Sequence, residues 1–382
     1  MHRRRYGVAI AALAIAVSCR PGAGDRSEVP SPRPGPDTAE ATPAANDEMG
    51  GPRAVHRATL LPDGRVLLTG GCSTAGCGGA AAGALAEVRH PDGSVVTVGR
   101  MHGSRLSHTA TLLPNGEVLV AGGYPGEGAP PTDSLEVFDP RTGTFRVVGR
   151  LNEARADHST SLLPDGRVLV AGGTDAGGQA LRSTEVVDPS TGAVSQGSTL
   201  PRPRSAHVVT DLGGDPLVVG GSADGIRAVR ATFRYDVAAE RWRSGPDLKR
   251  PRVKCAAVTL PDGTVLVLGG SGDVEGRSRY RSTEILRAGS DRFLPGPPLA
   301  EPRYKIADAV ALLQDGRLVV AGGTRPEVLD RRGRSFRTLP STLGGQWSFQ
   351  TATALAGGEV FVAGGYDDSI TPTARTWLVN AG

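Results

Sequence analysis

The residues of this 382-residue sequence that could perform chemistry recur at regular spacing. An Arg-x-x-His motif occurs four times, and its aligned histidines suggest a metal site: Arg53/His56, Arg105/His108, Arg155/His158 and Arg204/His207. Equivalent positions in neighbouring packed sheets lie about 10 Å apart, whereas one zinc ion needs every ligand nitrogen at about 2 Å. We therefore expect the histidines to be structural, and we predict no metal site and no cofactor.

Carboxylates follow the same repeat, at Glu87, Glu136, Glu185, Glu284 and Glu327. They could form a ring of charge for a ligand, or each could pair with the arginine that opens its repeat. Catalytic carboxylates are few and sit only where the reaction needs a proton transferred, whereas these residues occur once per repeat. We favour the ion pairs, which predict that Glu136 and Glu185 each lie within salt-bridge reach of an arginine.

The elements that position these residues are marked by seven double glycines, each of which ends a run of apolar β-forming residues. They are Gly70-Gly71, Gly122-Gly123, Gly172-Gly173, Gly220-Gly221, Gly269-Gly270, Gly322-Gly323 and Gly364-Gly365. A strand that is apolar at successive positions is buried on both faces. The spacing therefore indicates one unit of roughly 50 residues, repeated seven times.

Each unit reads as four antiparallel strands. A Leu-Pro-Asp-Gly or Leu-Pro-Asn-Gly turn precedes the apolar run, as at 61–64 and 113–116, and such turns connect hairpins. A variable loop and a third strand follow, as in "SLEVFDP" at 134–140, and then another turn and a fourth strand. Sheets of this kind must pack against one another, and a ring of them is a β-propeller. The prediction is an all-β, seven-bladed propeller with four-stranded antiparallel blades.

The double glycines, the pair Tyr235 and Trp242, and the opening Arg-x-x-His resemble the kelch repeat of bacterial kelch proteins and of the central domain of galactose oxidase. The resemblance runs from Met49 to the C-terminus. Most blades replace the Tyr/Trp pair, and blades five to seven lack the histidine. The last unit stops before its fourth strand. Because kelch-like rings close with a strand borrowed from the other terminus, the resemblance implies that residues 39–48 close the last blade.

The N-terminal residues are typical of a targeting signal rather than of part of the fold. Residues 1–18 have a basic start and a short apolar run, as in a signal peptide. The following Cys19 completes "AVSC", which resembles a bacterial lipobox and predicts lipidation of Cys19. The alternative is an ordinary signal peptide. Residues 19–48 read as a disordered tether, and residues 49–382 as the propeller. We expect a bacterial cell-envelope protein at the outer membrane or cell surface, with membrane contact through the lipid anchor only.

Charge and cysteines narrow the classes of function. The formal charge is +4, but without Arg3, Arg4 and Arg5 the count is 40 basic to 39 acidic residues. No basic stripe remains, so we expect no nucleic-acid partner. In an oxidising envelope Cys72 and Cys77 can form a local disulfide, the alternative being two free thiols. Cys255 should be unpaired and buried.

Two classes of function remain open. A binding or scaffold module would take a protein or a glycan. The alternative is a small-molecule or saccharide-modifying enzyme, epimerase-like or oxidase-like. The copper chemistry of galactose oxidase needs a Tyr crosslinked to Cys beside Tyr and His ligands, and the residues around Cys255 do not match that set. We favour a monomeric binding module over an enzyme, and a deep polar pocket with a clustered acid/base pair would reverse that preference.

The predicted ligand surface is the face with varied loops. With strands a to d numbered outward from the axis, the a–b and c–d turns share one face. The long b–c loops and the d–a connections share the other, and binding residues concentrate on loops held by a rigid scaffold. The alternative is that these loops vary because nothing constrains them. The predicted ligand-binding residues on this face are Ser107, Tyr124, Asp157, Lys254, Tyr280, Tyr304, Lys305 and Tyr366.

Overall fold

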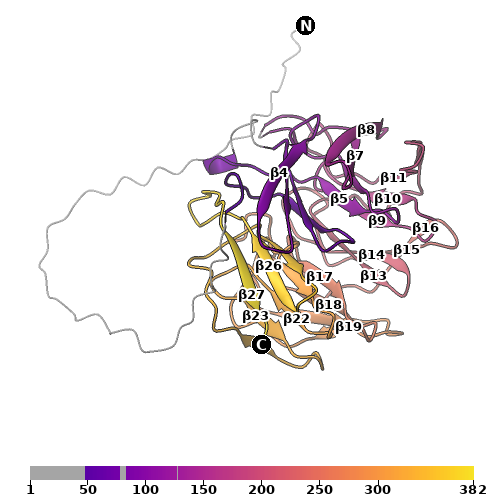
Figure 1. Ribbon diagram of the computed structural model, residues 1–382. Coiled ribbons are helices and arrows are strands. Elements are labelled where there is room, and N and C mark those ends of the chain that lie inside the picture. Colours follow the sequence, from indigo (N-terminus) through magenta and orange to yellow (C-terminus); the bar gives the residue numbers. More distant parts are fainter. Residues whose placement is uncertain (1–47, 78–82, 127) are drawn as a thin grey trace, which may run out of the picture. The chain divides into compact units, whose positions relative to one another are not determined.

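The computed structural model describes residues 48–77, 83–126 and 128–382, and these residues form consecutive antiparallel sheets (Figure 1). The first three blades contain β1 (Arg57–Leu60), β2 (Val66–Thr69), β3 (Leu85–Arg89) and β4 (Val95–Arg100); β5 (Thr109–Leu112), β6 (Val118–Ala121), β7 (Ser134–Asp139) and β8 (Thr144–Arg150); and β9 (Ser159–Leu162), β10 (Val168–Ala171), β11 (Thr184–Val187) and β12 (Val194–Gln196). A short 3-10 turn, η1 (Ala75–Cys77), lies in the b–c loop of blade 1.

The remaining blades follow the same order. They contain β13 (Val208–Leu212), β14 (Asp215–Val219), β15 (Phe233–Asp236) and β16 (Arg241–Ser244); β17 (Ala256–Thr259), β18 (Val265–Leu268), β19 (Thr283–Leu286) and β20 (Leu294–Pro295); β21 (Val310–Leu312), β22 (Leu318–Val320), β23 (Glu327–Leu329) and β24 (Phe336–Thr338); and β25 (Thr351–Ala354), β26 (Glu359–Ala363) and β27 (Thr376–Asn380).

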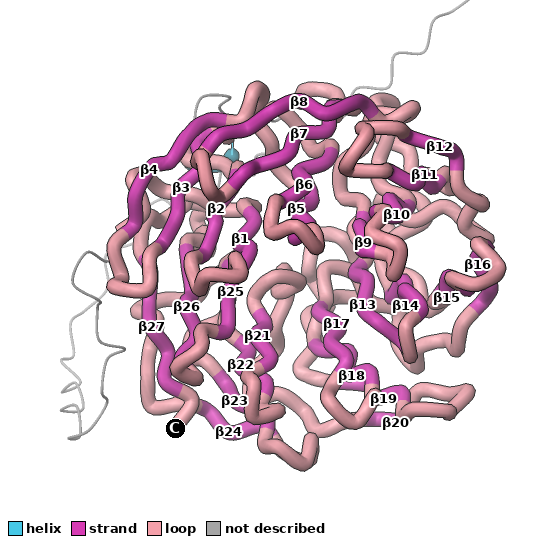
Figure 2. The backbone as a smooth tube through the Cα atoms, turned by 45° about the vertical axis from the view of Figure 1, so that its right-hand side comes forward, coloured by secondary structure: helices cyan, strands magenta, loops and turns pink. Residues whose placement is uncertain are grey.

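The sheets are the blades of a seven-bladed propeller, as the repeat predicted. Figure 2 shows the first strand of every blade on the inside of the ring, with later strands successively farther out. First strands of neighbouring blades contact one another from β1 to β17 and again from β21 to β25, and β1 also contacts β25, which joins the first blade to the last. Among the described residues no helix is long and apolar enough to cross a membrane.

The second strands form the core because both of their faces are covered. All four residues of β6 are buried. Val118 packs towards blade 1 with Leu67 and Phe138, whereas Leu119 packs towards blade 3 with Val168. Each buried aliphatic side chain of this kind contributes about 1.5–3 kcal/mol. The unbroken apolar run in the sequence is therefore the interface of one blade with two neighbours.

The last blade has three strands in the described residues, β25, β26 and β27. Glu48 forms an antiparallel bridge with Arg375, just before β27. The backbone N–H of Met49 then donates to the carbonyl of Ala374 at 2.9 Å. In blade 2 the end of the fourth strand makes the same contact, where Arg150 pairs with Ser134. Glu48 thus occupies the last position of a fourth strand, and the rest of the predicted closing segment, 39–47, lies outside the described residues.

Candidate ligand-binding site

Five blades contain a buried ion pair between the opening arginine and the glutamate of the third strand. The pairs are Arg53–Glu87 at 3.0 Å, Arg105–Glu136 at 2.6 Å, Arg155–Glu185 at 2.6 Å, Arg252–Glu284 at 3.1 Å and Arg303–Glu327 at 2.7 Å. The predicted pairing of Glu136 and Glu185 is confirmed. These carboxylates are at most 3 % exposed, so they do not form a charged ring open to a ligand.

In each pair the glutamate also accepts a hydrogen bond from a backbone N–H of the segment that leads into the blade. In blade 2, Arg105 donates to the carbonyls of Gly122 and Ser134 at 2.8 and 3.0 Å. Glu136 accepts the backbone N–H of His102 at 2.8 Å. A buried charge that lost its partner would be costly, so the pair fixes the connection that leads into the blade.

Two blades replace the ion pair with aromatic contacts at the same register. Val218 in blade 4 and Val362 in blade 7 stand opposite Phe233 and Trp377, where Val120 in blade 2 stands opposite Glu136. The Arg204 guanidinium lies 4.5 Å from the Phe233 ring centroid. Burial lowers the pKa of Arg204 to about 10, and the neighbouring Arg202 adds to that effect.

In blade 7 both partners are changed. Trp347 occupies the arginine position, and its ring lies 5.7 Å from that of Trp377. The glutamate is therefore absent from this register only where an aromatic side chain contacts the opening residue instead, which supports a structural role for the pair.

The four repeat histidines bond to hydroxyl groups of the preceding blade. The Nε2 atoms of His56, His108, His158 and His207 lie 2.8–3.0 Å from Thr351, Thr69, Thr109 and Ser159 respectively. Burial lowers the pKa of His56 and of His207 to about 3, with neighbouring arginines adding to the effect. A buried, neutral imidazole whose Nε2 is held in a bond between blades has a structural role.

Hydroxyl and histidine disappear together in the later blades. Val208 and Ala256 stand where Thr109 and Ser159 supply hydroxyls, and the following blades carry Cys255 and Ile306 at the histidine position. Both are buried, and a Cβ added to Gly220 or Gly269 of the preceding blade would meet them, as one added to Gly122 would meet His158. In six of the seven pairs the first glycine is needed, because an added Cβ would lie 2.3–2.6 Å from the carbonyl oxygen of the opening arginine of the next blade.

The residue just before the histidine position has a positive φ in all seven blades. The set, which we call the mouth ring, is Val55 (58°), Ser107 (51°), Asp157 (52°), Ala206 (50°), Lys254 (52°), Lys305 (60°) and Phe349 (56°). Left-handed backbone is unfavourable for residues other than glycine, and strain of this kind is characteristic of functional sites. The ring lies on the d–a connections, on the face predicted to bind ligand.

Hydrogen bonds between successive blades hold the mouth ring in place. The backbone N–H of Asp157 donates to Ser107 O at 3.1 Å, and that of Ala206 to Asp157 O at 3.0 Å. Lys305 and Phe349 continue the pattern, each donating to the preceding member at 3.0 Å. Because the backbone of the ring is held by these bonds, its side chains are not needed to support it. They line the mouth of the channel.

All seven members of the mouth ring line one cavity of about 70 Å³, which we call the mouth cavity. An ion pair between Arg57 and Asp308 also lines it and joins blade 1 to blade 6 across the channel. A second cavity, of about 220 Å³, continues between the first strands and shares Arg57 and Asp308 with the first. The mouth cavity by itself is far smaller than the roughly 300–1,000 Å³ of typical ligand pockets.

The structure places the predicted residues in three groups. Ser107, Asp157, Lys254 and Lys305 line the mouth cavity. Tyr304 and Tyr366 stand beside it, with their rings 5.2 and 5.0 Å from Lys305 Nζ. Tyr124 and Tyr280 do not line it. Tyr124 packs near the Cys72–Cys77 loop, and the Tyr280 ring lies against Arg252.

Sequence reasoning missed Val55, Ala206 and Phe349, which complete the ring. Their place in the repeat could have identified them, since each directly precedes the histidine position of its blade. A second signal was compositional. The sequence has 43 Lys and Arg residues, of which only Lys249, Lys254 and Lys305 are lysines. Two of the three belong to the mouth ring.

The two mouth lysines are electrostatically unusual. Burial lowers the pKa of Lys305 to about 8, and Lys254 and Arg279 add to the shift. Burial also lowers the pKa of Lys254, against the opposing effect of Asp157. Lys254 donates to the carbonyl of Val274 at 3.3 Å. Neither lysine forms an ion pair with a carboxylate of the described residues, and the Asp157 carboxylate has no hydrogen-bond partner there.

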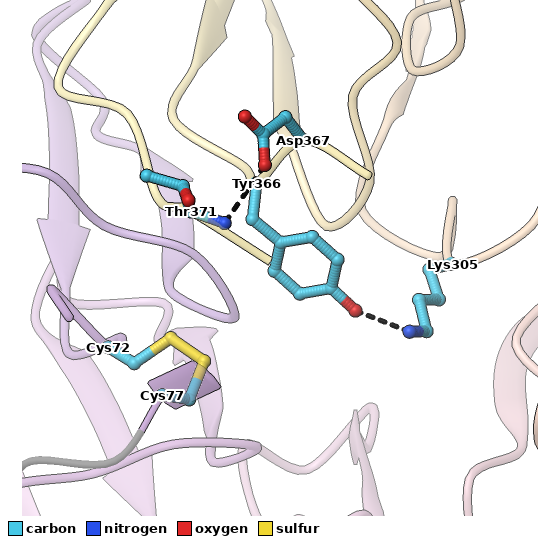
Figure 3. Close-up of a disulfide and its surroundings, with 6 residues drawn as sticks. All are labelled: Cys72, Cys77, Lys305, Tyr366, Asp367 and Thr371. Atoms are coloured by element: carbon cyan, nitrogen blue, oxygen red, sulfur yellow. Dashed lines mark hydrogen bonds between the residues drawn. A yellow bond between two sulfur atoms is a disulfide. The ribbon is translucent and has the colours of Figure 1, made fainter. Parts of the chain in front are cut away.

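A disulfide lies close to this site. Cys72 and Cys77 are joined, with their Cα atoms 5.0 Å apart. Figure 3 shows the bond near Tyr366, which packs with Cys72 and Leu106 in one apolar cluster. Cys255 is free and buried. Cys19, the predicted lipidation site, lies outside the described residues.

Two more hollows lie among the turns of the opposite face. One, of about 300 Å³, is bordered by Pro261, Asp262 and Arg331, and one of about 550 Å³ by Arg317, Arg337 and Gly382. Asp315 pairs with both Arg317 and Arg331, so the charges that border these hollows are partly neutralised.

Comparison with known proteins agrees with this architecture. The Kelch motif family matches residues 105–152 and 158–201, which correspond to blades 2 and 3. No curated protein matches the chain. A solved structure titled "Structure of YjhT" superposes with a TM-score of 0.60 at 12% identity, and the match covers 88% of this chain and 97% of that one. At this level of identity the likeness concerns the fold alone.

Proposed function

Because the chain is a kelch-repeat β-propeller, we propose that it is a binding module whose protein or glycan ligand places an acidic group in the mouth cavity. Seven equivalent backbone positions there carry side chains that follow no repeat, while the histidine-position residue after each of them is buried. The observation that carries the proposal is the pair Lys254 and Lys305, which face one cavity without a carboxylate partner among the described residues.

The dimensions of the site favour binding over catalysis on a whole sugar. The mouth cavity of about 70 Å³ takes an end group rather than a ring system. Its one carboxylate besides the paired Asp308 is Asp157, which forms no hydrogen-bonded acid/base pair with another described side chain. A ligand would therefore rest on the varied b–c loops and insert only its acidic end.

The proposal includes anchoring at the bacterial envelope. The signal-like residues 1–18 and Cys19 support export and acylation. Phase partitioning in detergent tests this part. The full-length protein should enter the detergent phase, and the Cys19→Ser variant should remain unprocessed or be released. Equal membrane association of both proteins would contradict the anchor and leave the binding site untouched.

The binding site is tested on a glycan array that contains acidic and neutral glycans, together with a pull-down from envelope extract. Lys254→Ala should reduce retention of acidic ligands at least about tenfold, since a lost charged contact costs about 1.5–3 kcal/mol. The matched control is Lys249→Ala, which removes the exposed lysine outside the cavity. Retention that is unchanged in Lys254→Ala, or lost equally in Lys249→Ala, would show that the ligand docks elsewhere.

A further inference from the structure

The basic side chains of the mouth ring are lysines, although almost all other basic residues of this protein are arginines. Lysines make up only three of the 43 Lys and Arg side chains, and no lysine takes part in an ion pair among the described residues, whereas the buried pairs within the blades use arginine. A guanidinium is always protonated, whereas a lysine ammonium loses its proton readily when it is buried and then becomes a nucleophile. Two lysines in the mouth ring therefore supply something that arginine cannot.

Lys305 has the surroundings of a reactive amine. Its Nζ lies 5.2, 5.3 and 5.0 Å from the ring centroids of Tyr304, Phe349 and Tyr366. Nζ is hydrogen-bonded to the Tyr366 hydroxyl, and Figure 3 shows these two groups pointing at one another. The rings exclude water from three directions, while the mouth cavity leaves the amine open on the remaining side.

Lys254 complements this arrangement with a second positive charge. Its Nζ lies 5.6 Å from the centroid of the same Tyr304 ring, and both lysines line the mouth cavity. An acidic group held by Lys254 would stand beside the Lys305 amine. The charged and titratable groups around Lys305 are Lys254, Arg279, Tyr304, Tyr366, Asp157, Arg57 and Asp308, together with the buried histidines His56, His158 and His207 of the same cavity.

We propose that Lys305 captures the carbonyl group of a small 2-oxo acid as a reversible imine, with the carboxylate of that acid held by Lys254. This inference rests on the proposed acidic-group site and adds a covalent bond to it. The mouth cavity of about 70 Å³ suits such a fragment, either free or at the end of a larger ligand.

The chemistry balances with the groups present. The lone pair of Nζ attacks the carbonyl carbon, and the carbonyl oxygen takes up a proton to give a carbinolamine. The C–O bond then breaks, water leaves, and a C=N bond forms. The Tyr366 hydroxyl can relay the proton from the amine to the departing oxygen, because burial raises the pKa of Tyr366 to about 12 and keeps the phenol protonated. Addition of water reverses the capture.

The test is reductive trapping of the full chain with pyruvate and cyanoborohydride, followed by peptide mass mapping. One reduced pyruvyl adduct should form on Lys305, which lies 51 residues after Lys254 and is therefore assigned to a different peptide from Lys249 and Lys254. The trapping rate should rise with pH to a half-maximum near pH 8, since the pKa of Lys305 is about 8. Tyr366→Phe should slow trapping by about 10²-fold, the scale of one acid/base group.

Variants separate this reaction from general lysine chemistry. Lys305→Arg should abolish the adduct, and Lys249→Arg should leave it unchanged. Lys254→Arg keeps the charge and should preserve pyruvate trapping, whereas Lys254→Ala should slow pyruvate at least about tenfold and spare acetaldehyde, which has no carboxylate. Equal labelling of Lys249 and Lys305, or full labelling of Lys305→Arg at another position, would overturn the inference. If trapping fails while Lys254→Ala still loses acidic glycans, the covalent step is wrong and the binding site stands.

Discussion

Blades 1–4 and blades 5–7 use the same framework differently. In blades 1–4 the position after the mouth ring is a histidine bonded to a hydroxyl of the preceding blade. In blades 5–7 it is Cys255, Ile306 or Gln350, and no such bond forms among the described residues. The large side chains of the mouth ring, Lys254, Lys305 and Phe349, belong to these later blades.

This difference shows that neighbouring residues have two separate roles, which are packing between blades and lining the mouth cavity. The opening residue and the histidine-position residue of each blade are buried in all seven blades except for the half-covered Trp347. The mouth-ring residue between them faces the cavity, and its left-handed backbone is supported by bonds to adjacent blades. The contacts between blades change from polar to apolar without altering the backbone of the mouth ring. The side chains of the mouth ring can therefore differ from blade to blade while the propeller fold is kept.

The largest expected effect is the loss of a buried ion pair. Arg105→Ala leaves Glu136 buried beside no guanidinium and should lower the free energy of unfolding by about 3–5 kcal/mol. Denaturant unfolding measures the change. The control is Arg141→Ala, whose exposed pair with Asp139 should have little effect on stability. Similar losses in the two variants would remove the distinction between buried and surface pairs.

A histidine transplanted into blade 5 tests the pairing with hydroxyl groups. Cys255→His should destabilise the protein by about 1–3 kcal/mol, because Val208 offers no hydroxyl and the ring nitrogen stays unpaired. Adding Val208→Thr should restore part of that loss, as measured by a double-mutant cycle. If the double variant is no more stable than additivity allows, the hydroxyl partner is not what selects histidine.

Acid should affect the histidine-bearing half most. The folded pKa of His207 is about 3 and the unfolded value about 6.5. Between about pH 3 and about pH 6.5 the unfolded state therefore binds more protons than the folded state. The free energy of unfolding is unaffected by this histidine above about pH 6.5 and falls as the pH drops below that value. The loss is up to about 1.4 kcal/mol per pH unit for each such histidine. Comparing unfolding at pH 7 and 5, His207→Gln should show a shallower dependence than the parent, and an equal slope would contradict the assignment.

The smallest effect concerns strain in the mouth ring. Ser107 has a φ of 51°, which glycine adopts without steric cost. Ser107→Gly should raise the midpoint of thermal unfolding, with a gain of about 0.5–1 kcal/mol after the entropy cost of glycine is subtracted. Ser161→Gly, within strand β9, should instead be destabilising. Destabilisation by both variants would show that the ring is not strained.

Much of the fold was readable from the sequence because each blade is a local unit. The double glycines, the turns and the apolar runs define seven meanders, and the Arg–Glu pairs follow from residues about 30 positions apart in one blade. The replacement of the pair by Phe233 and Trp377 was not foreseen, since its reason is a contact with Arg204 or Trp347 that only the strand register shows.

The candidate site was predicted in part. Four of the eight predicted residues line the mouth cavity, and Tyr304 and Tyr366 flank Lys305. Tyr124 and Tyr280 lie in or beside variable loops, but loop position does not fix the direction of a side chain. Tyr124 packs against the hydrophobic cluster around Cys72, and the Tyr280 ring packs against the buried Arg252.

The sequence by itself determined the number of blades, their strand order and the residues that repeat, because these depend on periodicity within about 50 residues. Only the tertiary structure decided which unrepeated residues meet. Lys254, Lys305 and Tyr366 come from three blades, and Arg57 reaches Asp308 across 251 positions of sequence. Closure of the ring brings the same backbone position of every blade to one axis, and there the left-handed turn directs each side chain into a common cavity that no single repeat contains.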